Sequence, residues 1–342
     1  MKTEVVPSRT GEERAEAASK AVALLRDGKT VALPTETVYG LAADAFNPIA
    51  VAKIFEAKER PRFDPLIVHL PNEEWLEHVT KIDKLSRELV EKLIAQFWPG
   101  PLTLVLGRRS IVPEIATAGL DTVAVRISAH EIFAEIVRAF GKPLAAPSAN
   151  RFGRISPTTA QHVQDELGGR IPLIVDAGPT GHGIESTIIA VRHGGIDILR
   201  RGPITAEQLR GMSFQPMSHR QDADATTVRA PGQLPSHYAP QTPLRVVEDL
   251  NSFSPKPNQH CALLAWNAIE KDKRFVAIRN LSERKDLREA AANLFRYLRE
   301  LDAPDVDLIV AEPVPDQGLG AAIMDRLHRA AHDRLDAPDR PG

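Results

Sequence analysis

The stretch PTETVYGL at residues 34–41, followed by KERPRFDPLIVH at residues 58–69, decides how this chain is interpreted. It gathers hydroxyls, a glycine, cations and a histidine around two apolar runs: Thr35, Thr37, Tyr39, Gly40, Lys58, Arg60, Arg62 and His69. Loops between a strand and a helix collect polar groups in this way, because binding residues sit on loops held by a rigid scaffold. The cations indicate an anionic ligand, and the hydroxyls indicate a ligand with groups to hydrogen-bond.

Length and composition narrow the class of protein. With 342 residues, two domains are the natural expectation. The net charge is −2, whereas a protein that relies on bulk affinity for nucleic acid is usually basic. A single cysteine, Cys261, excludes an internal disulfide and a Cys-rich zinc site, and its apolar neighbours predict a buried strand. The N-terminus has no apolar secretory segment and no run approaches the roughly 18 apolar residues of a membrane span, so we expect a cytoplasmic protein.

The order of elements favours a mixed α/β fold. Helices are expected over residues 12–26 and 84–97, and Asn47-Pro48 is typical of a helix start. Some strands follow one another with only turns between them, so we expect a twisted sheet with antiparallel as well as parallel pairs. Strands are predicted at residues 29–33, 66–70, 123–127, 144–146, 173–175, 187–191 and 196–199.

Two domains and a linker are predicted. The first domain covers residues 12–210, and the Pro-rich stretch 211–243 is an extended linker. The second domain covers residues 244–336, and its strands alternate with helices, which indicates a small parallel sheet. Its predicted strands are 244–247, 261–266, 275–279 and 307–311, and its predicted helices are 285–301 and 319–335.

Polar or cationic residues end at least five predicted strands within the first domain. They include His69, Arg126, the Ser148 and Asn150 of SAN and the Arg201 of RRG, and the Ser186 of GIEST lies where another strand begins. Each alone has a plain structural interpretation; Lys58 and Arg60, for example, could cover a solvated helix end. Together they predict a binding cleft at one edge of an α/β sheet. The groups are cations and neutral donors, which suit a nucleoside triphosphate and stabilise negative charge rather than supply a nucleophile.

Seven motifs in order carry a resemblance to a known family. They are PTETVYGL, KxRP with PLIVH, FWPGPLTLVL, VAVRI, PSAN, GIESTII and ILRRG, and they cover residues 20–205. In this set the chain resembles the threonylcarbamoyl-AMP synthase family, built on the YrdC-type domain. The second half, with APGQLPSHYAP, is similar to the longer branch. That branch implies a YrdC-type twisted mixed sheet with flanking helices, a long linker and a small C-terminal Rossmann-like α/β domain.

The resemblance implies a reaction and its participants. L-threonine, bicarbonate and ATP would give threonylcarbamoyl-AMP and pyrophosphate, and the product would serve threonylcarbamoylation of the tRNA adenosine next to the anticodon. Mg2+ would accompany ATP, held mainly by phosphates and water, with no metal site in the protein. The downstream tRNA threonylcarbamoyl transferase machinery is an expected partner, whereas membrane association and stable nucleic-acid binding are not expected.

The resemblance also implies residue roles. Lys58 and Arg60 would be catalytic through their charge. The implied ATP contacts are Lys58, Arg60, Arg126, Ser148, Asn150, Arg201, His237 and Tyr238, and the implied threonine contacts are Thr35, Arg60, His69 and Ser186. His237 and Tyr238 match a linker motif that folds over the cleft, so the linker is a candidate lid. The family commonly has Asn where this chain has Asp64, which adds negative charge near an anionic site.

Two alternatives stay open from the sequence. Hydrogenase-maturation carbamoyltransferases have related domains, but they carry Cys-rich modules that a chain with one cysteine lacks. An RNA-binding module would use the same cations on phosphates, and it would predict a basic stripe with interleaved aromatics. Aromatic residues make up only 5% of this chain, which disfavours the second alternative.

Overall fold

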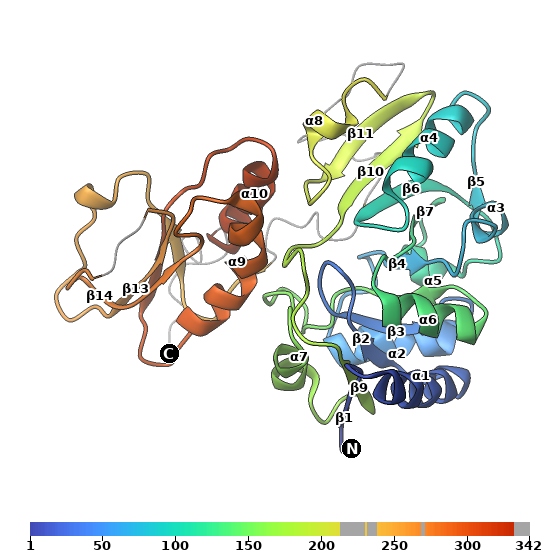
Figure 1. Ribbon diagram of the computed structural model, residues 1–342, viewed down its shortest axis with the longest axis horizontal. Helices are drawn as coiled ribbons and strands as arrows, with labels where there is room; N and C mark the ends of the chain where they lie inside the picture. Colours follow the sequence, from blue (N-terminus) through green and yellow to red (C-terminus); the bar gives the residue numbers. More distant parts are fainter. Residues whose placement is uncertain (213–229, 231–237, 268–270, 332–342) are drawn as a thin grey trace. The chain divides into compact units, whose positions relative to one another are not determined.

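The computed structural model describes residues 1–212, 230, 238–267 and 271–331 (Figure 1). The chain divides into two compact units. The first contains Met1–Phe152, Pro157–Gly181 and Glu185–Gln233, and the second contains Gly153–Ser156, His182–Ile184 and Leu234–Gly342. In the described part of the chain, no helix has both the length and the apolar character needed to cross a membrane.

The first unit is built on a mixed sheet whose strands run in the order β1-β9-β2-β3-β8-β4-β7-β6-β10-β11, with β5 paired to β6. Neighbours are parallel in four pairs, such as β4 with β7, and antiparallel in the others, such as β6 with β7. The expected mixture of orientations is therefore confirmed. The strands are β1 (Glu4–Pro7), β2 (Val31–Leu33), β3 (Gly40–Asp44), β4 (Ile67–His69), β5 (Thr80–Lys81), β6 (Leu102–Arg108), β7 (Thr122–Arg126), β8 (Leu144–Ala145), β9 (Leu173–Asp176), β10 (Thr187–Arg192) and β11 (Gly195–Arg200).

Helices cover the sheet through two apolar clusters. Successive side chains of a strand point to opposite faces, and β2 shows the consequence: Val31 and Leu33 belong to the cluster that includes residues of α1 and α6, whereas Ala32 belongs to the cluster that includes residues of α2, α4 and α7. The helices of this unit are α1 (Gly11–Arg26), α2 (Pro48–Lys58), α3 (Trp75–Val79), α4 (Arg87–Phe97), α5 (Glu114–Thr117), α6 (Glu131–Phe140), α7 (Ala160–Leu167) and α8 (Ala206–Leu209).

Local side-chain chemistry explains the element boundaries. The Asn47 side chain accepts from the Ile49 and Ala50 amides, which confirms the predicted helix start before Pro48. Helix α4 begins three residues later than predicted, because the Asp83 carboxylate accepts from the Leu85 and Ser86 amides and forms a turn first. Strand β1 was not predicted, since only one of its four residues is buried.

The second unit contains a four-stranded sheet in the order β12-β15-β13-β14, and every neighbouring pair is parallel, which confirms the predicted small parallel sheet. Cys261 begins the inner strand β13 and is buried, as the sequence predicts. The elements are β12 (Leu244–Val246), the short helix η1 (Leu250–Ser252), β13 (Cys261–Ala265), β14 (Phe275–Asn280), α9 (Leu287–Leu301), β15 (Leu308–Ala311) and α10 (Leu319–Ala331).

Candidate functional site

Two neighbouring parallel strands deliver the first pair of predicted residues to one edge of the sheet. Strands β4 and β7 end at His69 and Arg126, and these two residues are partners in the β4–β7 register. The loop that follows β2 lies at the same place, because the Arg126 guanidinium donates to the Thr37 hydroxyl at 3.1 Å. Strand order and strand length therefore bring together residues that lie far apart in the sequence.

Arg126 is buried in a network of polar groups. Its Nη2 lies 2.5 Å from the Glu36 carboxylate, its Nε donates to the Gly100 carbonyl at 3.0 Å, and Ser128 donates to the second Glu36 oxygen at 2.5 Å. Burial raises the pKa of Glu36, but the Arg126 charge and the Ser128 hydrogen bond outweigh it and bring the pKa to about 2. Glu36 therefore stays anionic and fixes the position of the arginine.

The loop that carries Thr35 is held by its own hydrogen bonds. The Thr35 hydroxyl donates to the Val38 carbonyl at 2.6 Å and accepts from the amides of Thr37 and Val38. A hydroxyl that bonds the following backbone locks a turn. Thr35 is thus presented by a rigid turn next to Arg126.

His69 is a buried, neutral imidazole. Burial and the nearby Arg126 charge lower its pKa to about 3. The ring packs against Phe133 with 4.7 Å between centroids. Its Nδ1 has no hydrogen-bond partner among the described residues. A buried polar atom of this kind is a suitable contact for a bound ligand.

Lys58 is the last residue of helix α2, and its side chain is hydrogen-bonded to the SAN loop at residues 148–150. Its Nζ donates to the carbonyls of Ser148 and Asn150, and the side chain is buried. Burial, with the neighbouring Arg60 charge, lowers its pKa well below the usual value. The alternative of a solvated helix end is therefore wrong for Lys58. When protonated, the group has three N–H donors; the two carbonyls use two of them, which leaves the third for a ligand oxygen.

Arg60 is paired with Asp64, the residue that departs from the family pattern. Both side chains are buried, and Arg60 Nη2 lies 2.8 Å from Asp64 Oδ2. The same guanidinium donates to the carbonyls of Asp64 at 3.2 Å and Pro65 at 2.9 Å. Burial raises the pKa of Asp64, and the charges of Arg60 and Lys58 oppose that rise. Asp64 thus balances part of the positive charge in its surroundings.

Ser186 lies immediately before strand β10. Its hydroxyl is hydrogen-bonded to the Thr103 hydroxyl at 2.8 Å and accepts from Arg200 Nη2 at 3.1 Å, while Arg200 Nε donates to the Ser186 carbonyl. The predicted Arg201 is instead partly exposed one residue after β11. The sequence predicted a ligand role for Arg201 and named none for Arg200, the other cation at this strand end, although alternation from Ile196 and Ile198 places Arg200 on the buried side of the strand.

The structure groups most of the predicted residues of the first unit. Backbone contacts join the Thr35 loop to the SAN loop, because Ala149 donates to the Tyr39 carbonyl and Ser148 pairs with Gly40. Glu36, Thr103 and Ser128 were not predicted as site residues, because their partners lie far away in the sequence. Tyr238 belongs to the second unit. His237 lies outside the described residues.

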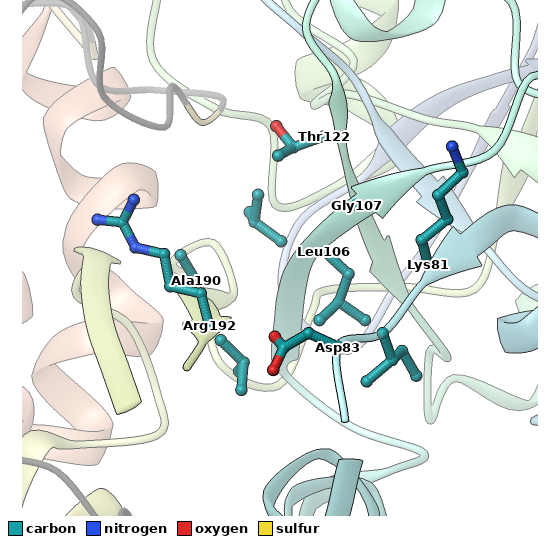
Figure 2. Close-up of a pocket in the computed structure, with 10 residues that line it drawn as sticks. Lys81, Asp83, Leu106, Gly107, Thr122, Ala190 and Arg192 are labelled. Carbon is teal, nitrogen blue, oxygen red and sulfur yellow. The ribbon is translucent and has the colours of Figure 1, made fainter. Parts of the chain in front are cut away.

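A pocket of about 340 Å³ lies toward the opposite ends of strands β6, β7 and β10 (Figure 2). Lys81 and Arg192 stand on opposite sides of it, and Arg192 is held by Asp197 at 2.7 Å. None of the predicted site residues that the structure describes lines this pocket. The lining residues are Lys81, Ile82, Asp83, Val105, Leu106, Gly107, Thr122, Ala190, Val191 and Arg192.

Two family models match the chain. The Sua5/YciO/YrdC model, described as "Telomere recombination", matches residues 23–202, and the model described as "Threonylcarbamoyl-AMP synthase, C-terminal domain" matches residues 204–332. Two proteins named threonylcarbamoyl-AMP synthase are similar along nearly their whole length. The Pyrococcus abyssi protein is 41% identical, with 92% of this chain and 94% of the relative covered. The Bacillus subtilis protein is also 41% identical, with 93% of each covered.

A solved structure from the same family is similar to this chain in fold as well as in sequence. The crystal structure of P. abyssi Sua5 in complex with L-threonine superposes with a TM-score of 0.86 at 37% identity, and it covers 96% of this chain and 98% of that one. The chain therefore belongs to the threonylcarbamoyl-AMP synthase family, in the branch that carries the additional C-terminal domain.

Proposed function

We propose that this chain makes threonylcarbamoyl-AMP from L-threonine, bicarbonate and ATP, releases pyrophosphate, and so acts as a nucleotidyltransferase. The product would be used to modify the tRNA adenosine next to the anticodon, in the cytoplasm. One observation carries the proposal: buried cations and neutral donors gather at one sheet edge in a chain that resembles, over almost all of its length, a protein crystallised with L-threonine. Such a site offsets negative charge and orients anionic reactants.

The reaction divides into two bond-forming steps. The threonine amine attacks bicarbonate carbon, water leaves, and a carbamate forms. A carbamate oxygen then attacks the α-phosphorus of ATP, the bond from that phosphorus to the bridging oxygen breaks, and pyrophosphate leaves with that electron pair. Both reactants of the second step are anions, so positive charge lowers its barrier most directly. No protein nucleophile is required.

The side chains suit these steps. Lys58 and Arg60 would contact the triphosphate together with Ser148 and Asn150, and Lys58 would also hold their loop through its two carbonyl contacts. Thr35, His69 and Ser186 would contact threonine: Thr35 is fixed by its turn, and neutral His69 offers Nδ1. Arg126 and Arg201 would lie near the nucleotide. Among the described residues, Arg200 holds Ser186 in place.

ATP would enter as its Mg2+ complex. Two carboxylates of the site, Glu36 and Asp64, are each paired with a guanidinium, which fits a metal ion carried by phosphates and water. The ion would supply charge neutralisation on the phosphates. The protein side chains would orient the carbamate and the α-phosphorus. The downstream tRNA threonylcarbamoyl transferase machinery would then use the product.

Pyrophosphate release from ATP tests the proposal. We expect the purified protein to release pyrophosphate only when L-threonine and bicarbonate are both present, and much more slowly with L-serine. Release that does not depend on threonine would contradict the proposal, and so would an inactive protein that still binds ATP. Retained ATP affinity at high salt would argue against an RNA-binding module, since binding to RNA falls steeply with salt.

A further inference from the structure

The second unit includes two short segments that lie far from it in the sequence. Gly153–Ser156 and His182–Ile184 cluster with the C-terminal domain rather than with the first unit. The first segment begins three residues after Asn150, and the second ends two residues before Ser186. Each segment is therefore the continuation of a loop that carries a predicted binding residue.

One stripe of helix α9 contacts both segments and the end of the linker. The stripe consists of Ala291, Ala292, Phe295 and Arg299, and residues three or four apart lie on the same side of a helix. We call these four residues the α9 stripe. The stripe makes a separate contact with each of the two segments and a third contact with the linker end.

Arg299 holds the first segment. Its Nη2 donates to the Ile155 carbonyl. The linker end also pairs with this segment through the backbone: Ala239 donates to the Gly153 carbonyl at 2.9 Å and forms a β-bridge with Arg154. The backbone that follows the SAN loop is thus fixed by a cation from α9 and by the residue that follows Tyr238.

Gly183 allows the second segment to lie directly against the backbone of helix α9. A Cβ at this position would lie 2.5 Å from the Ala291 carbonyl oxygen and 2.5 Å from Ala292 Cα, and the backbone has φ of +68°. Both the close approach and the left-handed backbone favour glycine here. The segment therefore reaches the helix backbone itself, immediately before the residues that lead to Ser186.

Phe295 holds the linker end through Tyr238. The two rings are stacked, with 5.5 Å between centroids and 25° between planes. Tyr238 is buried and has φ of +70°, an uncommon backbone conformation for a non-glycine residue. The guanidinium of buried Arg326 from α10 lies 5.2 Å from the Tyr238 ring centroid, and Arg326 pairs with Asp325. Two helices of the C-terminal domain thus fix this tyrosine.

We propose that the α9 stripe is a positioning element of the enzyme, with Arg299 and Phe295 as positioning residues. It ties the loop after Asn150, the loop before Ser186 and the linker residue Tyr238 to one rigid helix. The C-terminal domain thereby orders three ATP- or threonine-binding segments before the substrates arrive. The inference rests on the proposed function, because that function gives these segments their ligands.

Pre-ordering has a kinetic signature. A loop that is already ordered costs less conformational entropy when ligand binds. Loosening it should therefore raise KM for ATP, while kcat at saturating ATP changes little. A variant that is merely less stable would instead have fewer active molecules, which lowers apparent kcat and leaves KM unchanged.

The test compares Arg299→Met with Arg296→Met in the full-length chain. Arg296 is exposed on the same helix, so both variants lose one arginine from α9 but only one loses the Ile155 contact. We expect Arg299→Met to raise KM for ATP at least fivefold with kcat within twofold, Arg299→Lys to restore part of the difference, and Arg296→Met to match wild type. Equal KM values for the two methionine variants would overturn the proposal.

Hydrogen exchange provides a second readout that does not need activity. Amides of residues 148–156 should exchange faster in Arg299→Met than in Arg296→Met, and unchanged exchange would overturn the proposal even if wild type released no pyrophosphate. Gly183→Ala should likewise speed exchange at residues 182–187. Gly181→Ala is its control, because a Cβ there meets only the Glu36 carbonyl at 3.9 Å. An inactive wild type would refute the proposed function, and the exchange comparison would still decide the positioning role.

Discussion

His69 should make the first unit less stable as the pH falls from 7 to 5. The imidazole is buried beside Arg126, and its pKa is lowered from 6.5 to about 3. In the unfolded chain the same group protonates near pH 6.5. A group with a lowered pKa in the folded state stabilises the fold above its unfolded pKa. That stability is lost as the pH falls toward the folded pKa.

The magnitude follows from the two pKa values. One pKa unit corresponds to about 1.4 kcal/mol, and pH 5 lies about 1.5 units below the unfolded pKa. The free energy of unfolding should therefore fall by about 2 kcal/mol between pH 7 and pH 5 on account of His69 alone. The full loss, approached near pH 3, would be about 5 kcal/mol. Glu36, which lies near the ring, keeps its charge between pH 7 and pH 5 because its pKa is about 2.

The assay compares urea unfolding of the parent and of His69→Gln at both pH values. Trp75 and Trp98 lie in the first unit, so a Trp266→Phe background restricts tryptophan fluorescence to that unit. Other titrating groups, including half-buried His130, are common to both proteins and cancel. The parent should lose about 2 kcal/mol more than His69→Gln. Equal losses of unfolding free energy in the two proteins would refute the lowered pKa of buried His69.

Three further predictions concern the site. Lys58→Ala should lower kcat/KM roughly 100-fold or more, the scale of losing one charge-stabilising donor. It should leave the circular dichroism spectrum intact, and near-normal turnover would contradict the assignment. Asp64→Asn should lower KM for ATP by roughly tenfold, because it removes a negative charge 2.8 Å from Arg60; an unchanged or higher KM would count against this. Gly202→Ala should raise KM for threonine, since its Cβ would lie 2.5 Å from the Thr187 amide and 2.6 Å from the Glu185 carbonyl. Gly11→Ala, with open space around it, is the control.

Much of the local structure was predictable because its causes are local. The Asn47-Pro48 helix start, the buried Cys261 strand and helix α9 each depend on neighbours within a few residues. Sheet order is different. The two-residue strand β8 lies between β3 and β4, and no property of Leu144 and Ala145 specifies those distant partners.

The same distinction separates what was found from what was missed at the site. Residues in recognisable motifs, such as Lys58 and Ser186, were identified from the sequence. Glu36 was missed because its partner, Arg126, lies 90 residues further along the chain. Arg200 had a local signal in the alternation of β11, but Arg201 follows it directly, and Arg201 was chosen as the site residue. The clustering of residues 153–156 and 182–184 with the C-terminal domain depends wholly on tertiary contacts.

Mass spectrometry of the product shows whether this chain joins threonine, bicarbonate and AMP in one molecule. The protein is incubated with ATP, Mg2+, 13C-bicarbonate and 15N-threonine, and the nucleotide products are isolated. We expect one adenylate that carries both labels, together with an equal amount of pyrophosphate. An adenylate with 15N but no 13C, or hydrolysis of ATP to unlabelled products alone, would contradict it.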